Sequence, residues 1–139
     1  MNFPRIDEQS AEPLTILKRV YGYDGFRGKQ AAVVERVVSG GDAVVLFPTG
    51  AGKSLCFQIP SLCREGVGIV VSPLIALMRD QVEALKQLGV RAAALNSSLS
   101  QEELADVRGA LAGGALDLLY VTPERVVTTG FKEMIRSSK

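Results

Sequence analysis

A glycine-rich loop followed by Lys and Ser is the clearest chemical signal in the sequence. Residues 47–54 read F-P-T-G-A-G-K-S and directly follow an apolar run at residues 43–47. Gly50 and Gly52 let the backbone turn its N–H groups inward around a polyphosphate, and the helix expected next adds the positive end of its dipole. The pattern therefore predicts a nucleoside-triphosphate site. Its expected members are Thr49, Gly50, Ala51, Gly52, Lys53 and Ser54.

Two side chains of this loop carry the predicted chemistry. Lys53 can bridge the β- and γ-phosphates as a flexible point charge and is the candidate catalytic residue. Ser54 can offer its hydroxyl to Mg²⁺, an ion that accepts few protein ligands. Phe47 stands where the full G-x-x-x-x-G-K-[ST] pattern has its first Gly. The alternative is therefore a glycine turn before a capped helix, with Lys53 only solvated.

The residue types that are absent exclude other chemistry. The chain has no His, which excludes a Ser-His-Asp triad, a Cys-His dyad and a histidine metal ligand. Cys56 and Cys63 fit neither a CxxC redox pair nor a zinc half-site, so we expect two small apolar side chains in a reduced core.

Composition indicates one soluble, well-packed domain. The 139 residues are 47% hydrophobic, and 16 Lys and Arg against 15 Asp and Glu give a net charge of +1. Bulk charge therefore gives no sign of nucleic-acid binding. The sequence contains neither an apolar run of transmembrane length nor a secretory signal, so we expect no membrane partner.

Apolar patterning predicts an α/β scaffold for the loop. Continuous apolar runs, typical of parallel strands covered on both faces, occur at residues 43–47, 67–71, 92–95 and 116–121. Between the second and third runs, residues 73–88 have helical spacing. A helical lead-in is expected at residues 13–38. Strand and helix alternate as in βαβ units, which predicts a parallel sheet with flanking helices.

Hydroxyl residues mark the expected helix starts. Ser72 and Thr122 each precede a proline, an order typical of an N-cap followed by the first turn. Ser100 and Glu103 form an S-x-x-E capping box.

The expected helix ends are marked by other residues. Gly89 follows one helix, and the glycines at 113–114 follow another. The helix of residues 55–63 is expected to end around Pro60.

Several segments, in order, resemble the RecQ family of superfamily 2 helicases. They are residues 21–30 (motif 0), 47–60 (motif I), 70–81 (motif Ia), 95–97 and 119–125. The resemblance implies a P-loop NTPase of RecA-like α/β fold. It also implies an ATP-dependent helicase that couples ATP hydrolysis to 3′-to-5′ unwinding of duplex DNA in replication, recombination and repair.

In this family motif 0 holds the adenine of ATP. Tyr23 offers an aromatic face and Arg27 a planar guanidinium, so a base could be gripped between them. Gln30 has the donor and acceptor that pair with the N6 and N7 edge of adenine. Without the family, Tyr23 would be a core aromatic, and Arg27 and Gln30 would be solvated.

Motif Ia and the T-P-E-R segment resemble the family's single-strand contacts. Both follow the carboxyl end of a strand, where open α/β sheets place ligands, and both offer a hydroxyl at a helix start. The alternative is ordinary N-caps of ordinary helices. The expected partners are single-stranded and duplex DNA. The expected contacts are Ser72, Pro73, Thr122 and Arg125.

The sequence departs from the family at two positions. Gly28 replaces the usual Pro, which loosens the turn between Arg27 and Gln30. Ala51 replaces a common Gly, which requires a negative φ there.

The family's D-E-A-H segment, which positions Mg²⁺ and the attacking water, is not in the chain. We therefore expect an N-terminal part of a longer protein, truncated before the Walker B strand. It would comprise a lead-in at residues 1–38 and a partial RecA-like domain at residues 39–139. Zinc is expected only in a missing C-terminal part.

The isolated chain is expected to bind ATP and Mg²⁺ weakly, to be inactive in hydrolysis and to self-associate through exposed sheet edges. We expect a cytoplasmic location, associated with the nucleoid if the source is bacterial. The alternatives are a non-catalytic nucleotide- or DNA-binding module and a small-molecule P-loop kinase. Motif 0 and Phe47 argue against the kinase.

Overall fold

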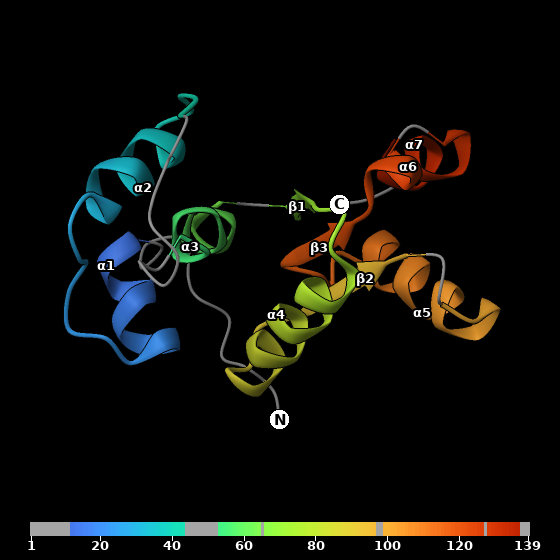
Figure 1. Cartoon of the computed structure of the whole chain (residues 1–139), viewed down its shortest axis with the longest axis horizontal. Helices are drawn as coiled ribbons and strands as arrows, with labels where there is room; N and C mark the ends of the chain where they lie inside the picture. The colour runs from blue at the N-terminus through green and yellow to red at the C-terminus, as the bar shows by residue number, and fades with distance from the viewer. Residues whose placement is uncertain (1–11, 44–52, 65, 97–98, 127, 137–139) are drawn as a thin grey trace. The chain divides into compact units, whose positions relative to one another are not determined.

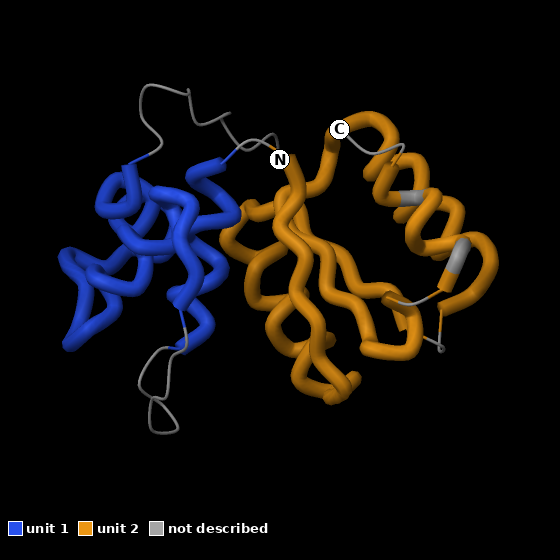
Figure 2. The backbone as a smooth tube through the Cα atoms, turned by 90° about the horizontal axis from the view of Figure 1, so that it is seen from above, with its two compact units in different colours: residues 1–65 blue, residues 66–139 orange. Residues whose placement is uncertain are grey.

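The computed structural model describes residues 12–43, 53–64, 66–96, 99–126 and 128–136. The chain forms two compact units, residues 1–65 and 66–139 (Figure 2). The strand expected at residues 43–47 lies almost wholly outside the described residues.

The first unit is helical. It contains α1 (Pro13–Ile16), the π-helix η2 (Leu17–Tyr21), α2 (Gln30–Val38) and α3 (Leu55–Cys63). In this unit α3 packs against α1 and α2 (Figure 1). The helices α1, η2 and α2 fall within the expected helical lead-in. The buried apolar side chains of the unit include Ile16, Leu17, Val20, Val34, Cys56 and Ile59.

The helical range of residues 55–63 is confirmed, but the helix does not end around Pro60, which lies inside it. Proline has no N–H and so removes one hydrogen bond from a helix interior. The side chain of Pro60 is buried in this unit, and Ser61 Oγ donates to the carbonyl of Phe57 at 2.8 Å. Packing against two neighbouring helices thus outweighs a local helix-breaking signal.

The second unit is an α/β layer structure. Its elements are β1 (Gly68–Val71), α4 (Ile75–Gln87), β2 (Ala92–Leu95), α5 (Gln101–Ala112), β3 (Leu118–Val121), α6 (Pro123–Val126) and α7 (Thr129–Arg136). The sheet has the order β1-β3-β2, and both pairings are parallel. Three of the four predicted strands are thus confirmed.

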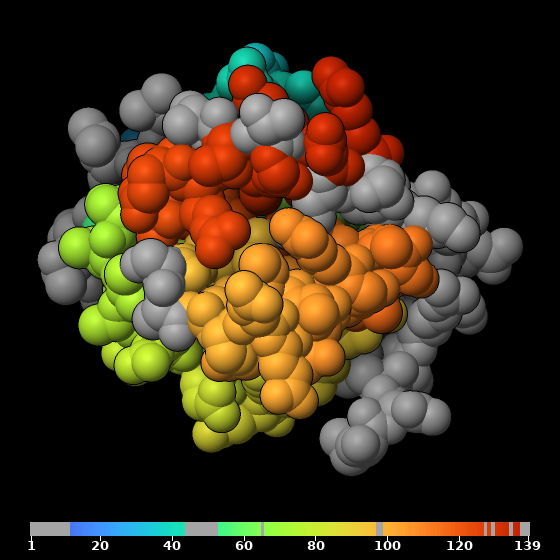
Figure 3. Space-filling model, turned by 90° about the vertical axis from the view of Figure 1, so that its right-hand side faces the viewer, coloured from blue at the N-terminus to red at the C-terminus, as the bar shows by residue number. Residues whose placement is uncertain are grey.

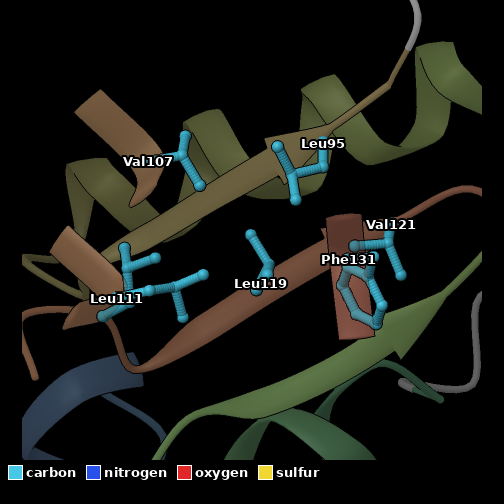
Figure 4. Packing of buried hydrophobic residues seen from close by; sticks show 7 residues of the cluster. Leu95, Val107, Leu111, Leu119, Val121 and Phe131 are labelled. Atoms are coloured by element: carbon cyan, nitrogen blue, oxygen red, sulfur yellow. The ribbon is translucent and has the colours of Figure 1, made fainter. Parts of the chain in front are cut away.

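The central strand β3 is buried along its whole length. Leu119 and Val121 belong to an apolar cluster with Leu95 of β2, Val107 and Leu111 of α5, Leu116, and Phe131 of α7 (Figure 4). Because side chains alternate along a strand, Tyr120 points the other way, and its hydroxyl donates to Gln81 Oε1 of α4 at 2.8 Å. The helices α5 and α7 pack together and both contribute side chains to the cluster. Figure 3 shows the outer surface of α5 in orange.

Arg91 and Asp117 fix the amino-terminal ends of β2 and β3. Arg91 donates from Nη2 to Asp117 Oδ1 at 2.8 Å and from Nε to Oδ2 at 3.2 Å. Two further hydrogen bonds join the backbones of these residues to the pair. The Arg91 N–H donates to Asp117 Oδ2, and the Asp117 N–H donates to the Arg91 carbonyl. The carboxylate of Asp117 raises the pKa of the guanidinium. Such a bidentate pair adds geometric specificity as well as energy.

The local signals at α5 are confirmed. Ser100 Oγ accepts from the Glu103 N–H at 3.1 Å, and Glu103 Oε1 accepts from the Ser100 N–H at 3.3 Å. At the other end, Gly114 has a φ of 70°, and Gly89 after α4 has a φ of 85°. These left-handed values are readily adopted only by glycine.

Candidate functional site

The start of α3 presents the two residues expected to carry phosphate chemistry. Lys53 is exposed and Ser54 is half-buried. Their carbonyls accept from Cys56 N–H and Gln58 N–H, each at 3.0 Å, so both residues belong to the entry of the helix. The rest of the predicted loop, Thr49 to Gly52, lies outside the described residues, as does the φ expected for Ala51.

The hydroxyl of Ser54 does not cap α3. Ser54 occupies the N-cap position with helical φ and ψ, and its side chain makes no capping hydrogen bond in the described part of the chain. The first turn of α3 also contains no acidic residue. The alternative of a glycine turn before a capped helix would therefore need a cap other than the Ser54 side chain. The positive end of the α3 dipole, the Lys53 charge and a Ser54 hydroxyl that does not cap the helix together suit a phosphate bound with Mg²⁺.

Tyr23 lies just after the π-helix η2, from which it is separated by Gly22. Gly22 follows η2 with a φ of 75°, and the N–H of Tyr23 donates to the carbonyl of Leu17 at 3.3 Å. The side chain of Tyr23 is 52% exposed. Tyr23 is therefore not the core aromatic that the sequence alone allowed, and its ring can meet a ligand.

Arg27 and Gln30 are joined by two hydrogen bonds. Gln30 Oε1 accepts from the Arg27 N–H at 2.8 Å, and the Gln30 N–H donates to the Arg27 carbonyl at 3.0 Å. The Arg27 side chain is exposed, whereas Gln30 is only 3% exposed. The expectation of a solvated Gln30 in the absence of the family was therefore wrong. The structure brings both residues into one turn, with the Gln30 amide held by the backbone N–H of Arg27.

Gly28, between these two residues, has a φ of 51°. Proline is fixed near a φ of −65°, so this turn cannot hold the residue that the family usually has here. The described turn thus depends on glycine itself.

Ser72 follows β1 but does not cap α4. The N-cap of α4 is Leu74, so the expected start at Pro73 was wrong. The Ser72 N–H donates to the Val121 carbonyl at 2.9 Å and so prolongs the pairing of β1 with β3. Its hydroxyl accepts from the Leu74 N–H at 3.2 Å, which closes a turn before the helix. Pro73 is exposed at the tip of that turn.

Thr122 follows β3, and α6 begins at Pro123 as expected. The Thr122 carbonyl accepts from the Arg125 N–H at 3.1 Å. Thr122 is only 1% exposed, however, and its hydroxyl has no hydrogen-bond partner in the described part of the chain. The hydroxyl is therefore no cap. The Arg125 side chain is half-buried.

The site prediction did not include Asn96. This residue directly follows β2 and is buried. It lies next to Thr122 at the end of the neighbouring strand β3, because the Thr122 N–H donates to the Leu95 carbonyl at 3.4 Å. Ser72, Thr122 and Asn96 therefore occupy successive strand ends at one edge of the sheet. The position of Asn96 directly after an apolar run was the signal that could have found it.

The cysteines do not form a reactive site. Both are free thiols. Burial raises the pKa of the Cys63 thiol to about 11 and also raises that of Cys56. A thiol with a raised pKa is a poor nucleophile and metal ligand at neutral pH. The described residues contain no group of three or more potential His, Cys, Asp or Glu metal ligands. None of the described helices has the length and apolarity to cross a bilayer.

Comparisons with known proteins place this geometry in a family. Residues 27–137 match the model of the DEAD/DEAH box helicase family. An ATP-dependent DNA helicase RecQ of Haemophilus influenzae is 48% identical over 126 residues, which are 91% of this chain and 20% of that protein. The RecQ helicase of Bacillus subtilis is 41% identical over 88% of this chain and 21% of its own length.

A plant relative, ATP-dependent DNA helicase Q-like 5 of Arabidopsis thaliana, is 41% identical over 94% of this chain and 14% of its own length. The chain thus spans about a fifth or less of the relatives named here. The expected resemblance to RecQ helicases is confirmed. On the family match over most of its residues, the chain belongs to the DEAD/DEAH box helicase family.

Proposed function

We propose that the chain is the ATP-binding part of an ATP-dependent DNA helicase of RecQ type, which hydrolyses ATP to move 3′ to 5′ along DNA. The observation that carries this proposal is the start of α3, where Lys53 is exposed and the Ser54 hydroxyl does not cap the helix. The names of the relatives support ATP and DNA as the substrates, since each relative is named an ATP-dependent DNA helicase. We place the protein in the cytoplasm, at the nucleoid if its source is bacterial.

The proposed phosphate site uses charge and an oxygen ligand. Lys53 would neutralise the β- and γ-phosphates, and Thr49, Gly50, Ala51 and Gly52 would cradle them through backbone N–H groups. Ser54 would hold Mg²⁺, and this ion would supply charge stabilisation of the transferred phosphoryl group. The D-E-A-H segment is not in this sequence, so we propose that the isolated chain binds Mg-ATP weakly and does not turn it over.

The proposed adenine site uses Tyr23, Arg27 and Gln30. The exposed ring of Tyr23 and the exposed guanidinium of Arg27 suit stacking on the two faces of a base. Gln30 Oε1 accepts from the Arg27 N–H, and an amide side chain is of the type that pairs with the N6 and N7 edge of adenine.

The proposed DNA contacts lie at the carboxyl edge of the sheet in the second unit. Pro73 is exposed, and Ser72 and Arg125 are half-buried, so a phosphate of single-stranded or duplex DNA can reach them. The hydroxyl of Thr122 is covered, and it meets a phosphate only when the chain around it moves. Such contacts need no large net charge on the protein, because a few positioned protein groups can hold the phosphate backbone of the DNA.

One experiment with two ligands tests the proposal. Tyr23→Ala is expected to weaken binding of a fluorescent ATP analogue about tenfold, since base stacking on an aromatic ring contributes roughly 1–3 kcal/mol. Arg125→Ala is expected to weaken binding of a labelled single-stranded oligonucleotide about fivefold at low salt, by loss of a phosphate contact. Fluorescence anisotropy measures both affinities.

Each variant is the control for the other. Tyr23→Ala should leave DNA affinity unchanged, and Arg125→Ala should leave ATP affinity unchanged. Equal affinity of the wild-type chain for ATP and GTP would contradict the adenine site. Undiminished DNA binding by Arg125→Ala would remove that residue from the proposed DNA contacts.

We also propose that the chain self-associates through β1, which is an edge strand of the described sheet. Ile69 and Val71 lie on the same face of β1 and are 38% and 52% exposed. Exposed apolar edge strands pair readily with another chain.

Sedimentation velocity at rising concentration should show dimers for the wild-type chain and monomers for Val71→Lys, because an edge lysine blocks strand pairing. Leu88→Lys, an exposed apolar residue just after α4, is the matched control and should still dimerise. A wild-type chain that stays monomeric throughout this range would rule the interface out.

A further inference from the structure

The hydrogen bond between Tyr21 and Gln58 connects the two halves of the proposed nucleotide site. Tyr21 Oη donates to Gln58 Oε1 at 3.0 Å, across 37 residues of sequence. We propose that this pair positions the adenine-binding segment relative to the phosphate-binding start of α3, so that one ATP molecule engages both. The inference rests on the proposed function, because it assigns positioning residues to that site.

Tyr21 is close in the chain to the adenine-binding residues. It is the last residue of η2 and lies two positions before Tyr23. Both Gly22 N–H and Tyr23 N–H donate to the carbonyl of Leu17, a fully buried residue in the same turn. The last turn of η2, which contains Tyr21, therefore fixes the backbone position of Tyr23. A π-turn of this kind is rare and occurs frequently at functional sites.

Gln58 is equally close to the phosphate-binding residues. It lies in the first turns of α3, and its N–H donates to the Ser54 carbonyl at 3.0 Å. Its side chain is 5% exposed and faces Tyr21. A continuous path of covalent and hydrogen bonds thus runs from Tyr23 through Tyr21 and Gln58 to Ser54.

Packing alone does not explain a polar pair at this place. Phe and Met have nearly the same volumes as Tyr and Gln and would fill the space without desolvating polar groups. The net stabilisation from one such hydrogen bond is small, whereas a buried bond specifies one arrangement of the two elements. The pair is thus suited to fixing the relative position of η2 and α3.

The test compares Mg-ATP with Mg-tripolyphosphate, which lacks the base. Calorimetry on the 139-residue chain should show that Tyr21→Phe weakens Mg-ATP binding about fivefold, the loss expected for one hydrogen bond. Its affinity for Mg-tripolyphosphate should stay at the wild-type value, because Lys53 and Ser54 are untouched. Gln58→Met removes the acceptor and should give the same selective loss, and the double variant should lose no more than either single one.

A matched control exists in the second unit. Tyr120 Oη donates to Gln81 Oε1 at 2.8 Å, so Tyr120→Phe removes the same kind of bond from the second unit and leaves η2 and α3 unaltered in sequence. This variant should bind both ligands as the wild type does.

The outcomes separate the inference from the proposed function. Unchanged Mg-ATP affinity in a folded Tyr21→Phe or Gln58→Met chain, or an equal loss for both ligands, would overturn the positioning role while the nucleotide site stands. A wild-type chain that binds neither ligand would overturn the proposed function, and the inference with it. A thermal melt of each variant shows whether it is folded.

Discussion

Lys53→Ala is expected to raise the dissociation constant of the chain for Mg-ATP about thirtyfold. A hydrogen bond to a charged group contributes roughly 1.5–3 kcal/mol, and the Lys53 ammonium would make such bonds to two phosphates. Lys53 is exposed at the entry of α3, so its loss should leave the melting temperature unchanged. Isothermal titration calorimetry gives the affinity.

Lys86→Ala is the control for this change. Lys86 is an exposed lysine in the last turn of α4, and its removal alters the net charge by the same amount without touching α3. Equal affinity of Lys53→Ala and Lys86→Ala for Mg-ATP would contradict the phosphate site. Repeated ATP turnover by the 139-residue chain, abolished in Lys53→Ala, would contradict the proposal that the isolated chain binds without hydrolysing.

Leu119→Ala is expected to reduce the free energy of unfolding by about 3 kcal/mol, within the range for large-to-small substitutions in a core. Leu119 is fully buried in the central strand, within the cluster that joins β2, β3, α5 and α7. A cavity there removes contacts from several elements at once. Urea unfolding followed by circular dichroism measures the change.

Leu77→Ala tests whether burial is the cause. Leu77 lies on α4 and is 44% exposed, so the same chemical deletion should cost well under 1 kcal/mol. A loss for Leu119→Ala no larger than that for Leu77→Ala would show that the cluster does not hold this unit together.

Local patterns predicted the elements of the second unit well. The apolar run at residues 92–95 matches β2, and β1 and β3 lie within their predicted runs. The capping box of Ser100 and Glu103 is local by nature and was found from spacing alone. Such features depend only on residues close in sequence, which is why they can be predicted from it.

Features that depend on distant residues were missed. Ser72 was expected to cap a helix, yet its N–H pairs with Val121, about fifty residues further on, and α4 starts later. The burial of Gln30 and of the Thr122 hydroxyl also results from tertiary packing. The strand order β1-β3-β2 has no local signal. For the candidate site, the sequence motifs indicated the candidate residues. The structure added that Tyr23 is exposed and that the Gln30 side chain accepts from the Arg27 backbone N–H.

The ion pair between Arg91 and Asp117 has a consequence for how the sheet assembles. It closes a loop of 26 residues, whereas the pairing of β1 with β3 joins Gly68 to Leu118 and closes a loop almost twice as long. The entropy lost on closing a loop grows with its length. Chain entropy therefore favours β3 pairing with β2 first, and β1 then adds to an existing two-stranded template.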